Sequence, residues 1–114
     1  MAKLRSDTTE VINRLKQESL EIVDEATALE LKIFERFGES EQTFSYMDEM
    51  KNVSEEASAS FTRLSTLQLQ VARSQPTATS ATLEVLTQSI ERTLARIPAL
   101  ERSIQEVKIE WNLP

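Results

Sequence analysis

The chain has 114 residues with a formal net charge of −6, and 39% of its residues are hydrophobic. This acidic balance repels nucleic-acid phosphates and anionic lipid headgroups, so we expect neither nucleic acid nor a membrane surface as a partner. The lack of cysteine and histidine excludes thiolate nucleophiles, imidazole bases and zinc–thiolate sites. One glycine is too few for a glycine-rich phosphate loop. We therefore predict no enzymatic activity and no cofactor.

The composition predicts an all-α fold. A sheet protein of this length needs several tight turns built from Gly, Asn, Asp or Pro, yet the chain has one glycine and three prolines. Good helix formers dominate instead. We predict a single domain over 1–114, an antiparallel up-down-up three-helix bundle with coiled-coil-like packing. Its helices should cover about 6–37, 41–73 and 80–112, with at least about three quarters of the chain helical.

The first predicted helix carries its apolar residues at helical spacing, and Gly38 follows the last of them, where a left-handed cap commonly ends a helix. Glu18, Glu21 and Glu25 fall together on a second face. Carboxylate-bridged metal sites in helical bundles also use histidine, so we interpret these acids as a solvated surface. The predicted core stripe is Ile12, Leu15, Ile22, Ala26, Leu29 and Ile33.

The second predicted helix begins at Ser40 or Thr43, because either side chain can accept hydrogen bonds from the first free amides. It is rich in Ser and Thr, which lower helix propensity, so its stability should depend on packing. Its predicted stripe is Met50, Val53, Ala57, Leu64, Leu67 and Val71. Pro76 favours an extended Gln75, which predicts a loop of about four to seven residues before the third helix.

The third predicted helix has a heptad pattern over four repeats. One series of core positions, seven residues apart, is Leu83, Ile90, Ile97, Ile104 and Trp111. A second series, three residues after the first, is Leu86, Thr93, Leu100 and Val107. Trp111 is expected to close the end of the core, although it could also be an anchor for a partner.

Pro98 admits two structures. A proline inside a helix removes one backbone hydrogen bond, so Pro98 could begin a short fourth helix at its tolerated first position. The seven-residue spacing of Ile90, Ile97 and Ile104 continues across the proline, however, and a turn would usually reset it. Ile97 is also a poor N-cap. We therefore predict one continuous third helix, kinked at Pro98.

Some apolar residues lie outside the predicted core stripes. Leu20 and Leu31 lie within about 20° of each other on the first helix, well away from its stripe. Leu69, Val85 and Ile109 are also outside the stripes of their helices. We interpret these residues as a partner surface, against the alternative of normal surface scatter. The sequence thus predicts a non-catalytic module for protein–protein interaction or assembly, with other helical proteins or itself as partner.

An alternative hypothesis is a small regulatory bundle that binds an apolar ligand between its helices. Such a site needs a buried polar group, and Thr93 is the only polar residue in the clean heptad. The basic residues Lys3, Arg5, Arg14 and Lys16 are too few for a phosphate-binding patch. The charged start does not resemble a signal peptide, and no apolar run approaches the ~20 residues of a membrane span. We therefore expect a cytoplasmic protein without membrane insertion.

Overall fold

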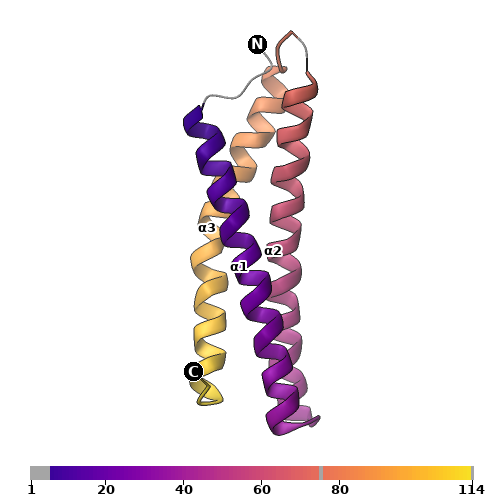
Figure 1. The fold of residues 1–114 in the computed structure, drawn as a ribbon, viewed down its shortest axis with the longest axis vertical. Coiled ribbons are helices and arrows are strands. Elements are labelled where there is room, and N and C mark those ends of the chain that lie inside the picture. Colours follow the sequence, from indigo (N-terminus) through magenta and orange to yellow (C-terminus); the bar gives the residue numbers. More distant parts are fainter. Residues whose placement is uncertain (1–5, 75, 114) are drawn as a thin grey trace.

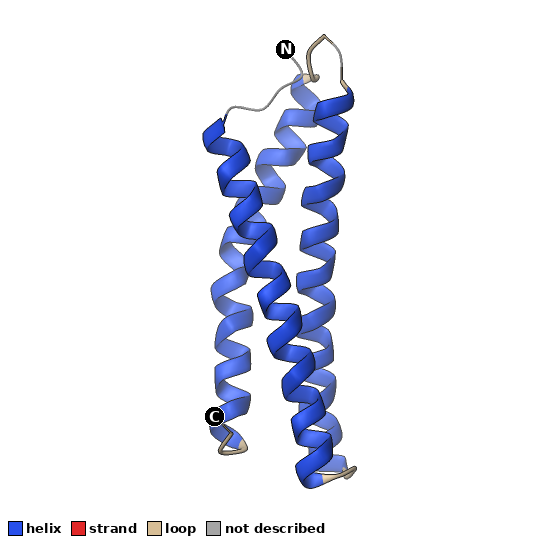
Figure 2. Cartoon of the chain, viewed as in Figure 1, coloured by secondary structure: helices blue, strands red, loops and turns tan. Residues whose placement is uncertain are grey.

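A computed structural model describes residues 6–74 and 76–113, and it is 90% helical. Its three helices are α1 (Ser6–Phe37), α2 (Glu41–Arg73) and α3 (Ser80–Glu110), and the described residues include no strand (Figure 2). The all-α prediction and the helix bounds are therefore confirmed to within two residues. The predictions for the basic start of the chain and for an extended Gln75 fall outside the described residues.

The three helices form an up-down-up bundle with overall dimensions of 56 × 20 × 17 Å (Figure 1). The short connections lie at opposite ends, so α2 runs antiparallel to both of its neighbours. The elongated shape follows from three helices of nearly equal length that turn back at each end. α1 and α2 share the most extensive contact, whereas α3 packs less closely on each of them.

Local backbone geometry fixes the turn between α1 and α2. Gly38 adopts a φ of 70°, and its amide donates to the Phe34 carbonyl at 2.9 Å, which forms the predicted left-handed cap. Ser40 is the N-cap of α2. The Thr43 amide donates to the Ser40 Oγ at 3.2 Å, and the Ser40 amide donates to the Thr43 Oγ1 at 2.8 Å. This reciprocal pair is a capping box in which threonine replaces the usual glutamate.

The C-terminal end of α3 is closed by a Schellman motif. The Leu113 amide donates to the Lys108 carbonyl at 2.8 Å, and the Asn112 amide donates to the Ile109 carbonyl at 3.1 Å. Asn112 occupies the left-handed position, with a φ of 53°. The motif turns the chain back, and Leu113 is buried against the core.

The predicted stripes of α1 and α2 are buried along their whole length. In α3 the stripe is buried from Leu86 onward, with interruptions described below. The stripes meet in one continuous core. Its buried hydrophobic side chains are Ile12, Leu15, Ile22, Ala26, Leu29, Ile33, Met50, Val53, Ala57, Leu64, Leu67, Val71, Leu86, Ile97, Leu100, Ile104, Val107 and Leu113.

Two predicted core positions of α3 are not buried. Leu83 is 40% exposed and Ile90 is only half-buried, so their assignment to the core was wrong. The N-terminal half of α3 leans toward α2 and away from the start of α1 (Figure 1). The side of α3 that would meet α1 therefore loses its cover, and Leu94 on the same side is also exposed. Ser89 is buried in place of Ile90.

α3 continues through Pro98 without a break, as the heptad phase predicted. Pro98 is exposed, whereas Ile97 and Leu100 beside it are buried. The Leu94 carbonyl, which loses its helical partner to the proline, therefore lies on the solvent side and can be hydrated. α3 bends near its middle, and the half before the bend leans toward α2 (Figure 1).

Aromatic side chains close the end of the bundle where α3 finishes. The Trp111 ring lies 4.7 Å from the Phe37 ring and 5.3 Å from the Tyr46 ring, measured between centroids, with an edge-on contact to Tyr46. Trp111 is packed against the core. Its indole Nε1 is buried without a hydrogen-bond partner, so apolar contact holds the ring in place. This placement agrees with a core-closing role rather than that of a free anchor.

We expect Ile97→Ala to reduce the free energy of unfolding by about 2–5 kcal/mol, because the side chain is 6% exposed and its removal leaves a cavity. Leu83→Ala is the matched control, and it should cost less than about 1 kcal/mol, since that leucine is largely solvated. Urea denaturation followed by circular dichroism measures both. Equal losses in the two variants would contradict the described placement of α3.

We expect Gly38→Ala to destabilise the protein by about 1 kcal/mol, because an L-residue with a positive φ brings its Cβ close to its own carbonyl. No other atom lies within 4 Å of the added Cβ, so the cost comes from the backbone alone. Gly38→Asn should cost less, since asparagine tolerates this conformation. Thermal unfolding of the three proteins tests the order, and an alanine variant as stable as the parent would show that the cap is not needed.

Candidate partner-binding surface

The described part of the chain exposes large hydrophobic side chains on all three helices. They are not distributed evenly, because those on α1 share a face while those on α2 and α3 are mostly separate. The exposed set is Leu20, Leu31, Phe34, Phe37, Phe44, Leu69, Leu83, Val85, Leu94 and Ile109. The predicted partner residues Leu20, Leu31, Leu69, Val85 and Ile109 are all among them.

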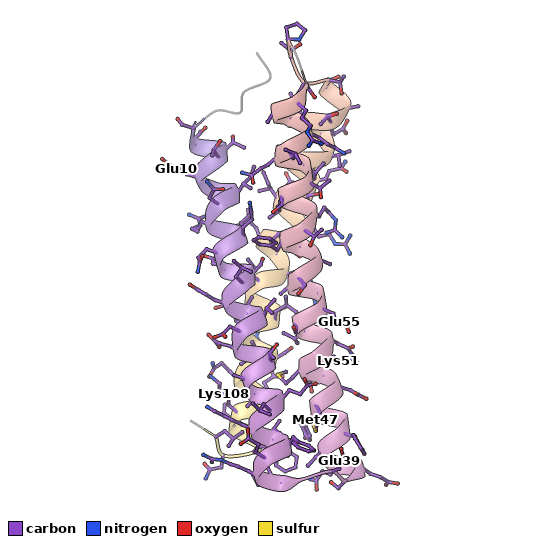
Figure 3. The ribbon with its side chains drawn as sticks, turned by 45° about the vertical axis from the view of Figure 1, so that its right-hand side comes forward. Glu10, Glu39, Met47, Lys51, Glu55 and Lys108 are labelled. Atoms are coloured by element: carbon purple, nitrogen blue, oxygen red, sulfur yellow. The ribbon has the colours of Figure 1, made fainter. Side chains whose placement is uncertain are left out.

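Of the three grooves described here, the most apolar lies between the second half of α1 and the start of α2. Its volume is about 450 Å³, and it has predominantly apolar walls. Leu31 and Phe34 are 55% and 44% exposed, and Met47 of α2 completes the apolar floor. Figure 3 shows Met47 on the side of α2 that adjoins α1. The lining residues, which we call the α1–α2 groove, are Asp24, Thr27, Ala28, Glu30, Leu31, Phe34 and Met47.

The α1–α2 groove arises from a second stripe on α1, beside the core stripe. Leu20, Thr27 and Phe34 are seven residues apart, so they lie along one line of the helix. The Thr27 Oγ1 lies 3.4 Å from the Ser54 Oγ, which shows that this line follows the seam with α2. The structure thus places Leu31 beside Phe34 and Met47 in the groove, with Leu20 further along the same face of α1. The spacing from Leu20 to Phe34 could have revealed Phe34, whereas Met47 requires the register of the two helices.

Polar contacts occupy the same seam nearer the start of α1. The Lys16 Nζ donates to the Gln68 Oε1 at 3.0 Å and lies 5.2 Å from the centroid of the Phe61 ring. The Gln68 amide also donates to the Asn13 Oδ1 at 3.2 Å. The Lys16 ammonium group is therefore engaged by neighbours within the bundle. The seam leaves apolar side chains exposed only in its other part, toward the end of α1 and the start of α2. Of the other predicted basic residues, Lys3 and Arg5 fall outside the described residues.

Two carboxylates border the α1–α2 groove. Asp24 is exposed and Glu30 is half-buried, and within the described residues neither forms an ion pair. Lys51 lies one turn after Met47 on α2 (Figure 3) but does not line the groove. The groove therefore combines an apolar floor with two carboxylates that form no ion pair within the described residues.

The remaining predicted partner residues do not join this surface. Leu69 and Val85 are about half exposed and Ile109 is 77% exposed, yet none of them lines a groove described here. They lie on α2 and α3, whereas Leu20 and Leu31 lie on α1. Of the predicted set, only Leu31 lines the α1–α2 groove, and Leu20 lies further along the same face of α1.

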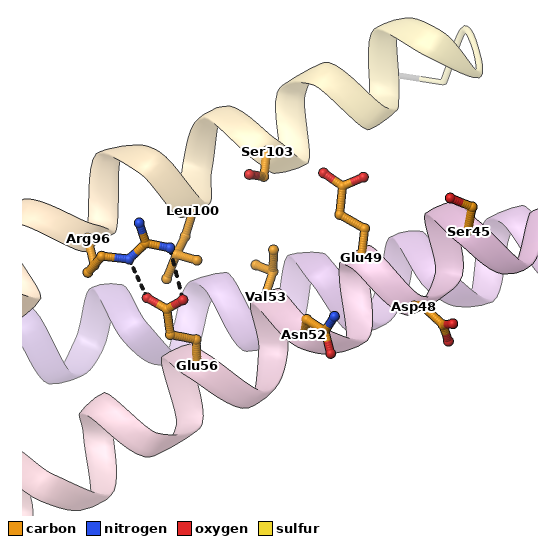
Figure 4. A pocket seen from close by; sticks show the side chains of 9 residues that line it. All are labelled: Ser45, Asp48, Glu49, Asn52, Val53, Glu56, Arg96, Leu100 and Ser103. Atoms are coloured by element: carbon orange, nitrogen blue, oxygen red, sulfur yellow. Dashed lines mark hydrogen bonds and ion pairs between the residues drawn. The ribbon is translucent and has the colours of Figure 1, made fainter.

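The groove between α2 and α3 is polar. Arg96 donates from Nε and Nη2 to the two carboxylate oxygens of Glu56, at 2.6 and 2.9 Å, across a groove of about 390 Å³ (Figure 4). Hydrogen bonding from Arg96 lowers the pKa of the Glu56 carboxyl below its ordinary value. This bidentate pair fixes the position of α3 relative to α2, and its side chains remain largely solvated.

The groove between α1 and α3 follows from the leaning of α3. It has a volume of about 390 Å³, and Leu94 and Pro98 of α3 face Arg14 and Glu18 of α1 across it. The Arg14 Nε lies 3.9 Å from the Glu18 Oε1, so these opposite charges are already paired. This groove has fewer exposed apolar side chains than the α1–α2 groove and mixed charge.

Two of the buried hydroxyl groups are satisfied within their own helices, whereas the buried Ser65 Oγ has no hydrogen-bond partner within the described residues. The Thr93 hydroxyl donates to the Ser89 carbonyl at 2.8 Å, and the Ser19 hydroxyl donates to the Leu15 carbonyl at the same distance. Thr93, the polar residue that the ligand hypothesis required, is therefore already partnered.

Two of the acidic side chains predicted to share a face of α1 form ion pairs with different partners. Glu18 faces Arg14, and the Glu25 Oε2 lies 3.9 Å from the Lys108 Nζ. In residues 6–74 and 76–113 no group of three or more acidic side chains is close enough to hold a metal ion. No helix in that part of the chain is long and apolar enough to cross a membrane.

Comparisons with protein-family models, with curated proteins and with solved structures gave no match to this chain. The functional interpretation therefore depends on the geometry of the bundle and its surface.

We expect Glu56→Gln to lower the melting temperature slightly at pH 7 and to have a smaller effect at pH 3. The pKa of Glu56 is lowered in the folded state, so its contribution is present above the ordinary value of 4.5 and disappears as the pH falls through the folded-state pKa. Glu55→Gln, an exposed neighbour, is the control and should change little at either pH. Equal melting temperatures for parent and Glu56→Gln at pH 7 would show that the pair contributes no stability.

Proposed function

We propose that this protein is a non-catalytic helical module for protein–protein interaction or assembly, which associates through the exposed face of α1. The observation that carries the proposal is the α1–α2 groove, where Leu31, Phe34 and Met47 form one apolar surface open to solvent. The partner is a helical protein or a second copy of the chain. A cytoplasmic location forms part of the proposal.

The second stripe of α1 is not needed to build the bundle. The core stripe of α1, from Ile12 to Ile33, is fully buried without help from Leu20 or Leu31. Exposed apolar side chains that gather along one line, with polar groups at the border, are typical of surfaces that bind another protein. Covering them removes apolar area from water at about 25 cal/mol per Å², which gives association a driving force.

The alternative of a small regulatory bundle that holds an apolar ligand has less support. The volume of the α1–α2 groove, about 450 Å³, falls in the range of ligand pockets. The groove is open to solvent at the edge of the α1–α2 seam, however, and is not a cavity in the core, where the hypothesis requires the ligand. The buried hydroxyl of Thr93 is also engaged by the Ser89 carbonyl and is not free to orient a ligand.

We expect Leu20→Glu combined with Leu31→Glu to abolish association and to leave the fold intact, because both side chains are about half exposed. Light scattering at known concentration measures self-association. Affinity purification of the tagged chain from its source cells, followed by mass spectrometry, measures binding to other proteins. Circular dichroism and thermal unfolding verify that the double variant is folded.

The matched control is Leu69→Glu combined with Ile109→Glu, which adds the same charge on other helices. This variant should keep the association. A parent protein that is strictly monomeric and copurifies with no other protein would contradict the proposal. Association that persists in the Leu20 and Leu31 variant would remove the α1 face from the interface.

A further inference from the structure

The acidic border of the α1–α2 groove points to the chemistry of its partner. We propose that the groove binds a cationic amphipathic helix of another protein, with an apolar stripe on the groove floor and lysine or arginine beside it. This inference rests on the proposed function and names the class of partner. It follows from the placement of Asp24 and Glu30 relative to the apolar side chains between them.

The two carboxylates flank the apolar stripe. At about 100° per residue, Asp24 and Glu30 are separated by about 120° around α1, and Leu31 and Phe34 project between them. A helix that lies along the stripe would bring its own flanking positions close to both carboxylates. Because neither acid has a partner in an ion pair within the described residues, basic side chains at those positions would meet uncompensated charge.

The same charges disfavour a second copy of the chain in this groove. In a symmetric dimer the same surface of both copies meets, so an interface through the groove would bring the Asp24 and Glu30 carboxylates of both copies together. The net charge of −6 adds general repulsion between copies. A partner helix with basic residues beside its apolar stripe would meet neither the repulsion between carboxylates in the groove nor the general repulsion between two acidic copies.

The length of the stripe sets the length of the bound helix. Leu20 and Phe34 are separated by about 21 Å at 1.5 Å per residue, so about four helical turns cover the stripe. Apolar residues at spacings of three, four and seven would reach Leu31, Phe34 and Met47. The flexible thioether of Met47 can adapt to different apolar side chains, so charge would contribute a large share of the discrimination between partners.

The test uses the full chain and two synthetic peptides of about 18 residues. Both peptides have leucines at heptad spacing. One has lysines beside the leucines and the other has glutamates at the same positions, and each carries a fluorophore. Fluorescence anisotropy should show that the lysine peptide binds at least about tenfold more tightly, and that its binding weakens as salt screens the charges.

The decisive variant is Asp24→Lys combined with Glu30→Lys, which should reverse the preference in favour of the glutamate peptide. Glu84→Lys combined with Glu106→Lys is the matched control. It changes the net charge by the same amount, but both residues are exposed on α3, which contributes nothing to the groove. The control should still prefer the lysine peptide. Circular dichroism confirms that both variants are folded.

Equal binding of the two peptides, or an equal loss of preference in both lysine variants, would overturn the proposal. So would a dimer of the parent protein that Asp24→Lys with Glu30→Lys strengthens, because the groove would then be occupied by a second copy. If neither peptide binds while Leu20→Glu with Leu31→Glu still abolishes association, the class of partner is wrong and the proposed function stands. If that pair also has no effect, both proposals fail.

Discussion

The packing of α1 against α2 is the interaction on which the rest of the structure depends. Each helix buries one uninterrupted stripe, from Ile12 to Ile33 and from Met50 to Val71, and the two stripes meet along nearly their whole length. The cap at Gly38 and the capping box at Ser40 hold the short turn that brings α2 back antiparallel to α1.

α3 packs against the other two helices less uniformly, and this leaves some of its apolar side chains exposed. Its buried positions include Ser89 and Thr93, which bury less apolar area than leucine or isoleucine would. Pro98 lies between the two halves of the helix and on the solvent side, where a bend costs least. The half that precedes it follows α2, and Leu83 and Leu94 are left without cover. The end of the bundle where α3 finishes, by contrast, is well closed, because the Schellman motif and the ring contacts of Trp111 seal the last turn of α3.

Helical periodicity allowed the three helices to be predicted, because a stripe of apolar residues repeats at the helical period wherever a helix buries one face. The same pattern could not predict that Leu83 and Ile90 stay partly exposed. A heptad tells which face of α3 is apolar, but it does not tell whether a neighbour covers that face at every level. For a similar reason, the sequence predicted only some of the residues at the groove. Leu20 and Leu31 were visible as apolar residues outside the core stripe, whereas Met47 adjoins Leu31 only through the register between α1 and α2.

A helix in a three-helix bundle has two neighbours, and together they can cover only part of its circumference. A further apolar stripe on such a helix must therefore remain exposed or be covered by something outside the bundle. On α1 this stripe runs beside the seam with α2 and ends at Phe34. Around the helix axis, Asp24 and Glu30 lie on either side of the last part of the stripe. The half-buried, unpaired Glu30 loses part of its hydration without gaining a partner charge. A basic helix in the groove would cover the apolar side chains and compensate that carboxylate together, so one partner resolves both features of the surface.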